Sequence, residues 1–243
     1  MLHYTRSGEG EPLILVHGFL GANEVFSSVM ADLTAKYDVI AVDLPGHGQS
    51  EVEKDRYTVY DYASEVAAVL QKEGVSEATW LGHSLGGYVV LAAIERQIAP
   101  INRGILAYSS DLADTAEQKE KRTKQQQEIP EIGVEAFVDN IIAAFFREDA
   151  SSELIDQARH IAYRATEEGL QVALEAMKAR PDQHELLEQT QTPILIIEGS
   201  QDKVLKPINT TNANVKKVVT NTGHLGMLEE PQNFVDAIQE FML

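Results

Sequence analysis

The pentapeptide Gly-His-Ser-Leu-Gly at residues 82–86 constrains the fold more than any other segment of the chain. It follows the apolar stretch 78–81 and precedes the helical-looking run 87–94. In the pattern G-x-S-x-G the serine occupies a sharp turn from strand to helix, and the glycines omit the Cβ atoms that would collide there. We therefore expect the hydroxyl group of Ser84 to project into a cleft.

An acid and a histidine follow this serine in the chain. Asp202 comes shortly after the apolar strand-like segment 193–199, and His224 comes after the strand-like segment 217–219. A serine hydroxyl is a poor nucleophile unless a base lies within hydrogen-bond reach, and that base needs a third group to hold its tautomer. The order Ser84, Asp202, His224 thus supplies a nucleophile, an orienting acid and a base.

Two more loops complete a family resemblance. His17-Gly18-Phe19 follows the strand-like segment 13–16, and the turn Asp-Leu-Pro-Gly-His-Gly-Gln-Ser at 43–50 follows the strand-like segment 39–42. With these motifs the chain resembles the α/β-hydrolase superfamily over nearly its whole length. It looks closest to the small, lidded serine esterases. The superfamily also includes carbon-carbon hydrolases, cofactor-free haloperoxidases and a synthase of the menaquinone pathway.

The resemblance implies an oxyanion hole built from two backbone N–H groups. Leu85, directly after the nucleophile, would supply one, and Phe19 would supply the other, with Leu20 as the fallback. Some members of this fold take their acid from an earlier strand. Asp111 therefore stands as the alternative to Asp202, which we prefer.

The remaining motif residues are interpreted as scaffold. His17, His47 and His83 lie in the quoted loops, where a histidine usually serves as a hydrogen-bonded structural residue, and Asp43 is interpreted as an acceptor of backbone N–H groups within its turn. These three histidines and His224 fall in four separate loops without metal-ligand spacing. Residues 82–87 also lack the glycine spacing of a dinucleotide-binding loop. We expect no metal and no cofactor.

Strand-like and helical segments alternate along the chain, which is typical of an α/β fold with a mostly parallel sheet covered on both faces. Thr58, with Asp61 three positions later, resembles a capping box at a helix start. The α/β-hydrolase core is predicted to comprise residues 1–110 and 191–243. We expect strands at 2–6, 13–17, 39–43, 78–83 and 104–109, and helices at 23–35, 59–73 and 85–96.

Residues 111–190 contain no strand-like segment and are interpreted as an all-helical cap, or lid, inserted between core strands. The resemblance places this insertion between the sixth and seventh core strands. It begins with a very polar helix near 113–122, and the helix 134–146 then carries apolar residues spaced three and four apart. This apolar face is interpreted mainly as cap interior. The candidate substrate-binding residues are Leu20, Tyr88, Phe145, Phe146, Met177 and Leu225.

Composition limits the partners and the compartment. The chain has 38 acidic and 20 basic residues, a net charge of −18, which repels phosphate backbones and anionic membrane surfaces. We expect no nucleic-acid or membrane partner. There is no cysteine, and the first residues resemble no signal peptide, so a soluble cytoplasmic protein is expected.

Three functions are compatible with these residues. The first is a carboxylic-ester hydrolase that cleaves small-molecule esters of small, largely apolar acyl groups through an acyl-enzyme. The second is a lyase or synthase of the menaquinone pathway, or a carbon-carbon hydrolase, using the same triad. For the synthase the resemblance implies an arginine where this chain has Tyr88, which counts against it. The third is a non-catalytic binding module. Dehalogenase and epoxide-hydrolase chemistry is excluded because Ser84 stands where those enzymes need a carboxylate.

Overall fold

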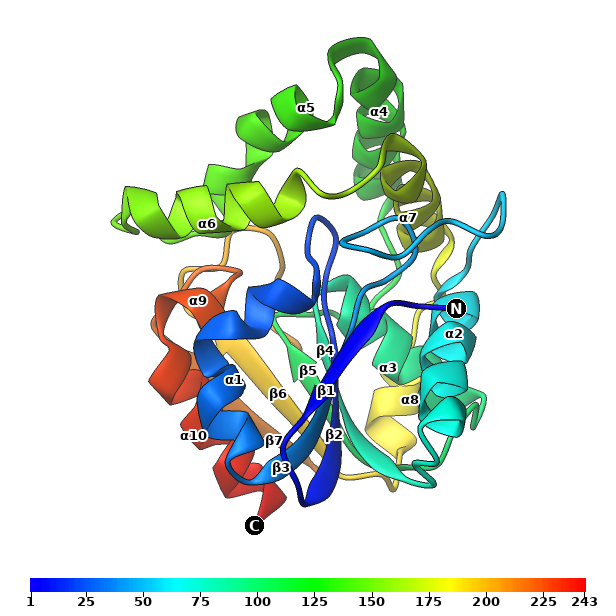
Figure 1. Cartoon of the computed structure of the whole chain (residues 1–243), viewed down its shortest axis with the longest axis vertical. Helices are drawn as coiled ribbons and strands as arrows, with labels where there is room; N and C mark the ends of the chain where they lie inside the picture. Colours follow the sequence, from blue (N-terminus) through cyan, green and yellow to red (C-terminus); the bar gives the residue numbers. More distant parts are fainter.

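A seven-stranded sheet forms the centre of the computed structural model, which describes residues 1–243 (Figure 1). Its strand order is β1-β3-β2-β4-β5-β6-β7, and every pairing is parallel except that of β1 with β3. The expected mostly parallel α/β sheet is confirmed. The strands are β1 (Tyr4–Ser7), β2 (Glu11–Val16), β3 (Tyr37–Val42), β4 (Ala78–His83), β5 (Ile101–Ala107), β6 (Ile194–Gly199) and β7 (Val215–Thr220).

Helices cover both faces of the sheet, because each parallel connection must cross back over it. On one face α1 packs against α10, and on the other α3 packs against both α2 and α8 (Figure 1). The helices around the core are η1 (Asn23–Phe26), α1 (Ser27–Thr34), α2 (Val59–Lys72), α3 (Leu85–Glu95), α8 (His184–Gln189), α9 (Gly226–Glu229) and α10 (Pro231–Met242).

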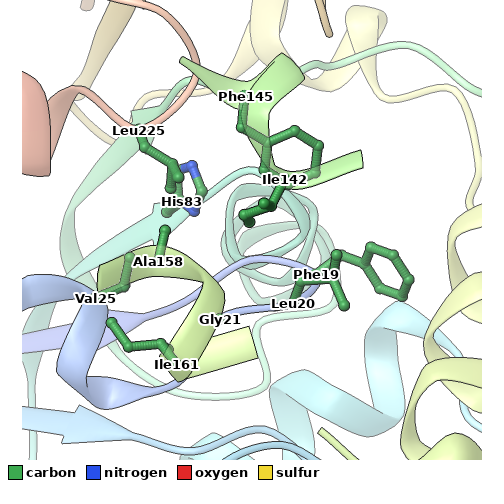
Figure 2. Close-up of a pocket in the computed structure, with 10 residues that line it drawn as sticks. All are labelled: Phe19, Leu20, Gly21, Val25, His83, Ile142, Phe145, Ala158, Ile161 and Leu225. Carbon is green, nitrogen blue, oxygen red and sulfur yellow. The ribbon is translucent and has the colours of Figure 1, made fainter. Parts of the chain in front are cut away.

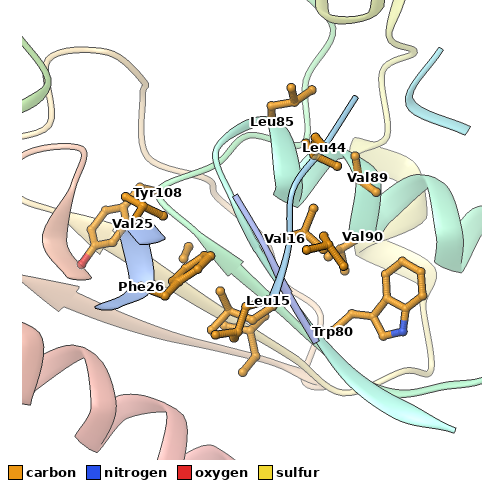
Figure 3. Close-up of a cluster of buried hydrophobic side chains, with 14 of the residues drawn as sticks. Leu15, Val16, Val25, Phe26, Leu44, Trp80, Leu85, Val89, Val90 and Tyr108 are labelled. Atoms are coloured by element: carbon orange, nitrogen blue, oxygen red, sulfur yellow. The ribbon is translucent and has the colours of Figure 1, made fainter. Parts of the chain in front are cut away.

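The unit formed by β4 and α3 lies in the middle of the core. Figure 3 shows Trp80 of β4 near Val90 of α3, with Leu15 and Val16 of β2 in the same cluster of apolar side chains. These four side chains are fully buried. Because a close-packed interior resists displacement, the turn between β4 and α3 is held firmly from both sides.

Between β5 and β6 the chain contains helices alone. The insertion therefore falls between the fifth and sixth strands of this sheet, and not between the sixth and seventh, because the sheet has seven strands with β1 as its single antiparallel edge. Helices α4 to α7 lie over the end of the sheet at which β4 gives way to α3, whereas α8 lies beside α3 (Figure 1). The helices over the sheet are α4 (Ala116–Ile132), α5 (Val134–Ile141), η2 (Ile142–Phe145), α6 (Ser152–Ala162) and α7 (Glu167–Ala179).

Some element boundaries differ from those expected. The helix predicted at 23–35 begins as the 3₁₀ turn η1, and the helix predicted at 134–146 changes at Ile142 into the 3₁₀ turn η2, with Phe146 in extended conformation. Apolar spacing identifies the buried face of a helix but does not specify where a turn tightens. The capping box at α2 is confirmed, since the Thr58 hydroxyl accepts from the backbone N–H of Asp61 and the Asp61 carboxylate accepts from that of Thr58.

Candidate active site

Ser84 lies on the turn between β4 and α3 in a strained backbone conformation. Its φ of 50° and ψ of −113° are sparsely populated by residues other than glycine, and such strain persists only where the surroundings enforce it. The surroundings do so through two hydrogen bonds. Ser84 N–H donates to the carbonyl of Ala107 at 3.0 Å, and the hydroxyl of Ser109 donates to the carbonyl of Ser84 at 2.8 Å.

Glycine is required on both sides of Ser84 because the backbone approaches too closely for a side chain. A Cβ atom at Gly82 would lie 2.1 Å from the carbonyl oxygen of Gly86, and one at Gly86 would lie 2.2 Å from that of Val16. The two glycines thus allow the strand to reverse directly into the helix. This geometry is the strand-to-helix turn that the pentapeptide predicts.

Asp202 and His224 form a hydrogen-bonded pair beside this turn. His224 Nδ1 lies 2.8 Å from Asp202 Oδ2, and both side chains are buried. A proton on Nδ1 in this bond leaves the lone pair of Nε2 available as a base. The structure shows no hydrogen bond between Ser84 and His224, although both line one cavity; such bonds commonly tighten only when substrate is present.

The other oxygen of Asp202 is held by the backbone. Oδ1 accepts hydrogen bonds from the N–H groups of Val204 at 2.7 Å and Leu205 at 3.3 Å. Burial alone would raise the pKa of Asp202, but the contact with His224 and these two N–H groups outweigh it, so this pKa lies below its ordinary value. Asp202 therefore remains a carboxylate beside His224.

The loop carrying His224 is fixed from three sides. Glu229 accepts a hydrogen bond from the N–H of Gly223 at 2.9 Å, and His83 Nε2 donates to the carbonyl oxygen of His224 at 2.9 Å. From the helical insertion, the carbonyl of Phe145 accepts from the N–H of His224 at 2.7 Å. The Phe145 ring also meets the imidazole edge-on, with 5.5 Å between ring centroids.

His83 and His17 act as scaffold in this structure, as the motifs predict. Burial lowers the pKa of His83 to about 3, so its ring is neutral when it supports the His224 loop. The neutral His17 ring accepts from the N–H of Leu44 at Nε2 and donates from Nδ1 to the carbonyl of Gly18. His17 thereby ties the loop that contains Phe19 to the loop after β3.

Asp43 also acts as scaffold in that second loop. Its carboxylate accepts from the backbone N–H groups of Asn23 at 2.7 Å and Gln49 at 3.0 Å, and it also contacts His3. Burial alone would raise the pKa of Asp43, but these N–H groups lower it below its ordinary value. The Asp43 carboxylate thus provides hydrogen-bond acceptors for backbone N–H groups around this loop.

The backbone N–H groups of Phe19 and Leu85 are the predicted donors of an oxyanion hole. Leu85 is the first residue of α3, where an α-helix leaves its N–H groups without intrahelical partners. The N–H of Phe19 has no hydrogen-bond partner within the chain. Phe19 lines the same cavity as Ser84, and Leu85 directly follows Ser84 in the chain, so both N–H groups are free of intrachain partners close to the elbow in structure or sequence.

That cavity has a volume of about 280 Å³ and lies between the core and the helical insertion. Ser84, His224 and Phe19 contribute its core side. Of the candidate substrate-binding residues, three line it: Tyr88, Phe145 and Met177.

Leu20 and Leu225 line a different, smaller cavity that also borders Phe19 and Phe145 (Figure 2). It offers about 10 Å³, roughly the room of one water molecule. We expected both leucines to contact substrate, but both are buried and line this small cavity, and neither lines the cavity that contains Ser84.

Phe146 lines neither cavity. It is buried, and the chain leaves the helical path at this residue, so the helical spacing that grouped Phe146 with Phe145 no longer applies. Asp111, the alternative acid, lies 2.7 Å from His184 Nδ1 and makes no contact with His224.

One face of α4 lines the Ser84 cavity, which its sequence pattern does not indicate. Gln118, Lys121, Arg122 and Gln125 occur at positions i, i+3, i+4 and i+7, which place them on the same side of the helix. This regular spacing of polar residues is the sequence signal by which this wall of the cavity could have been predicted. It does not distinguish a cavity wall from a solvated surface, because so polar a helix offers no apolar face to indicate the side turned inward.

The structure contains neither a cluster of metal-binding side chains nor a helix that could span a membrane. No group of three or more histidine, aspartate and glutamate side chains is arranged to hold a metal ion. No helix combines the length and the apolar character needed to cross a bilayer.

Comparisons with known proteins find relatives that match nearly the whole chain. The chain is 26% identical over 259 aligned positions to 3-oxoadipate enol-lactonase 2 of Acinetobacter baylyi, covering 99% of this chain and 92% of the relative. It is also 26% identical to 2-succinyl-6-hydroxy-2,4-cyclohexadiene-1-carboxylate synthase of Serratia proteamaculans, covering 95% and 92%. A shorter match, 39% identical over 111 residues, spans 40% of the length of the hydrolase YugF of Bacillus subtilis.

A solved structure is similar over the whole chain. The thermophilic esterase of Thermogutta terrifontis, described with malate bound, superposes with a TM-score of 0.92 at 27% identity, covering 99% of this chain and 92% of the esterase. The family model described as alpha/beta hydrolase fold matches residues 11–231. This match spans most of the chain, from the first parallel strand to the start of the last helix, and it includes the elbow at Ser84. The protein therefore belongs to the α/β-hydrolase fold family.

Proposed function

We propose that this protein is a serine hydrolase that cleaves carboxylic esters through an acyl-enzyme. The observation that carries the proposal is the hydrogen bond between His224 and Asp202, 2.8 Å long, together with a cavity that both His224 and the strained elbow at Ser84 line. Backbone strain of this kind costs on the order of 1–3 kcal/mol and clusters at functional sites. A purely structural turn would gain nothing from it.

In the first half of the proposed reaction, Ser84 Oγ attacks the ester carbonyl carbon while His224 Nε2 takes the hydroxyl proton. Asp202, held as a carboxylate, stabilises the imidazolium that forms. The carbonyl oxygen becomes an oxyanion, which the N–H groups of Phe19 and Leu85 stabilise by about 3–4 kcal/mol per donor. The intermediate then breaks its bond to the alcohol oxygen, which receives the proton from His224.

In the second half, water replaces the alcohol. His224 removes a proton from the water as it attacks the acyl carbon, the same donors stabilise the second oxyanion, and the acid leaves as Ser84 recovers its proton. No cofactor or metal enters these steps. The apolar wall of Tyr88, Phe145 and Met177 suits an apolar acyl chain.

We further propose that the insertion at 111–190 acts as a lid, with helices α4 to α7 over the sheet. The proposal is supported by direct contacts between this insertion and His224, the proposed base. Phe145 accepts the backbone hydrogen bond of His224 and packs its ring against the imidazole. Lid movement would therefore alter both access to the cavity and the position of His224.

The proposal is tested with p-nitrophenyl butyrate and the Ser84→Ala variant. Hydrolysis should fall by on the order of 10⁴–10⁶, with little change in melting temperature, because only one oxygen atom is removed. Folding is checked by circular dichroism. Retention of more than about one-hundredth of the wild-type rate in the folded variant would refute Ser84 as the nucleophile.

A second candidate is a lyase in which the same triad abstracts a proton. It is favoured by two cationic side chains in the cavity, Lys121 and Arg122, and by the relationship to the Serratia synthase. The two candidates separate when purified protein is assayed side by side on a butyrate ester and on the intermediate that such a synthase consumes. Efficient elimination with only trace ester cleavage would favour the lyase.

A further inference from the structure

The cavity that contains Ser84 is lined by basic side chains and by no acidic ones. Lys121 and Arg122 of α4 and Lys203 of the loop after β6 reach it, and its lining includes no aspartate or glutamate. The whole chain carries a net charge of −18, so random placement of charge would make acidic residues the more common lining. The cavity is therefore an exception to the electrostatics of the surface.

Two of these three cations retain the capacity to bind an anion. Lys121 makes no ion pair or hydrogen bond within the chain, although it lines the cavity. Arg122 contacts Asp114 through Nε and Nη2, which leaves Nη1 without a partner. Lys203 is largely exposed and lies 2.6 Å from Glu148, so it contributes little net charge.

Behind Arg122 lies a buried cluster with unequal charge. The fully buried carboxylate of Asp114 contacts both Arg122 and Arg180, and the Arg180 side chain is only 3% exposed. One negative charge thus faces two positive charges. The Arg180 guanidinium also lies over the ring of Tyr88, 4.2 Å from its centroid, and that ring lines the cavity. Excess positive charge in a poorly solvated wall favours an anionic group nearby.

We propose that the ester substrate carries a free carboxylate, which Lys121 and Nη1 of Arg122 bind while the acyl carbonyl lies at Ser84. This inference rests on the proposed ester hydrolysis and names its substrate class: a monoester of a dicarboxylic acid with an apolar spacer. The spacer contacts Phe145 and Met177, and the carboxylate lies against the polar face of α4. Guanidinium and ammonium donors form charge-assisted hydrogen bonds with carboxylates, stronger than neutral ones.

The test compares a charged ester with a neutral ester of the same shape. Monomethyl adipate is assayed beside methyl 6-methylheptanoate, in which an isopropyl group replaces the carboxylate, and the ratio of their kcat/KM values is the readout. Monomethyl succinate and monomethyl suberate extend the series to shorter and longer spacers. The wild type should prefer a charged ester by about tenfold or more, mainly through a lower KM.

A matched pair of variants on α4 isolates the cavity charge. Lys121→Gln and Lys124→Gln each remove one positive charge from an exposed position on the same helix, but Lys124 pairs with Glu120 and does not line the cavity. The selectivity ratio should fall about tenfold in Lys121→Gln and stay within about twofold in Lys124→Gln. Because Arg122 also holds Asp114, its variants are reserved for confirmation after a check of folding.

The outcomes separate this inference from the function on which it rests. If p-nitrophenyl butyrate and all methyl esters resist cleavage, the proposed hydrolase function fails. If neutral esters are cleaved as well as charged ones, or if both lysine variants change the ratio equally, only the carboxylate site is refuted. Competitive inhibition of p-nitrophenyl butyrate hydrolysis by adipate, weakened in Lys121→Gln, is expected as an independent measure of binding.

Discussion

Acidification should destabilise this protein through His83, and the size of the effect follows from its burial. The side chain is 3% exposed and its pKa in the folded chain is about 3, against about 6.5 in the unfolded chain. Between these values only the unfolded chain binds the proton. The folded state therefore has the full contribution of neutral His83 above pH 6.5 and loses it as the pH falls toward 3.

The magnitude is about 1.4 kcal/mol for each pH unit below 6.5, so moving from pH 7.5 to pH 5.0 costs about 2 kcal/mol for this one ring. Replacing His83 by Gln removes the titration and keeps an amide N–H in a position to donate to the carbonyl of His224. The free energy of unfolding in the wild type should thus decrease by about 2 kcal/mol more than in His83→Gln over this range.

Urea unfolding at the two pH values measures this difference, with fluorescence of the only tryptophan, the fully buried Trp80, as the signal. The carboxylates and the other buried histidines titrate in both proteins, so their contributions cancel. An equal loss of stability in wild type and variant would refute the argument. So would a His83 ring resonance that titrates near pH 6.5 in the folded protein.

Three further predictions concern the elbow, the acid and the lid. Ser84→Gly should raise the melting temperature by about 2–4 °C, because glycine relieves the backbone strain by more than it adds entropy to the unfolded chain. Ser84→Ala should leave the melting temperature unchanged. Equal melting temperatures for the two variants would argue against strain. Asp202→Asn should lower the rate of ester hydrolysis by about 10⁴. Asp111→Asn loses only the contact with His184, so it should lower this rate by less than about tenfold. The reverse ranking of steady-state rates would assign the role of the acid to Asp111. Replacing residues 116–179 with a short linker should expose apolar core surface and change acyl-chain preference, measured over a series of p-nitrophenyl esters; unchanged preference would show that the insertion does not shape the pocket.

The sequence predicts the central part of the fold because its strongest signals are local. The glycines around Ser84 are required because a Cβ atom at either position would lie about 2 Å from a backbone atom. The pentapeptide sequence shows these glycines directly. Asp202 and His224 come after apolar strand-like segments, and parallel strands bring the residues at their carboxyl ends to one edge of the sheet. The capping box at Thr58 is likewise a matter of neighbouring residues.

The insertion is predicted less well because its arrangement depends on tertiary contacts. Apolar spacing groups Phe145 with Phe146, but the change to a 3₁₀ turn sends only Phe145 into the cavity. The polar face of α4, with Lys121 and Arg122, turns inward although its composition resembles that of a solvated helix. Asp114 and Arg180 are far apart in the sequence and meet only in the folded protein, so no local sequence pattern predicts their contact.

The central claim is that Ser84 is a nucleophile activated by His224. A fluorophosphonate probe tests it directly, because this reagent phosphonylates an activated serine and is not released. Mass spectrometry of the digested protein should find one probe on the peptide that contains Ser84, and no labelling in Ser84→Ala. Labelling that persists in Ser84→Ala, or a wild type that remains unlabelled while it hydrolyses esters, would contradict the account.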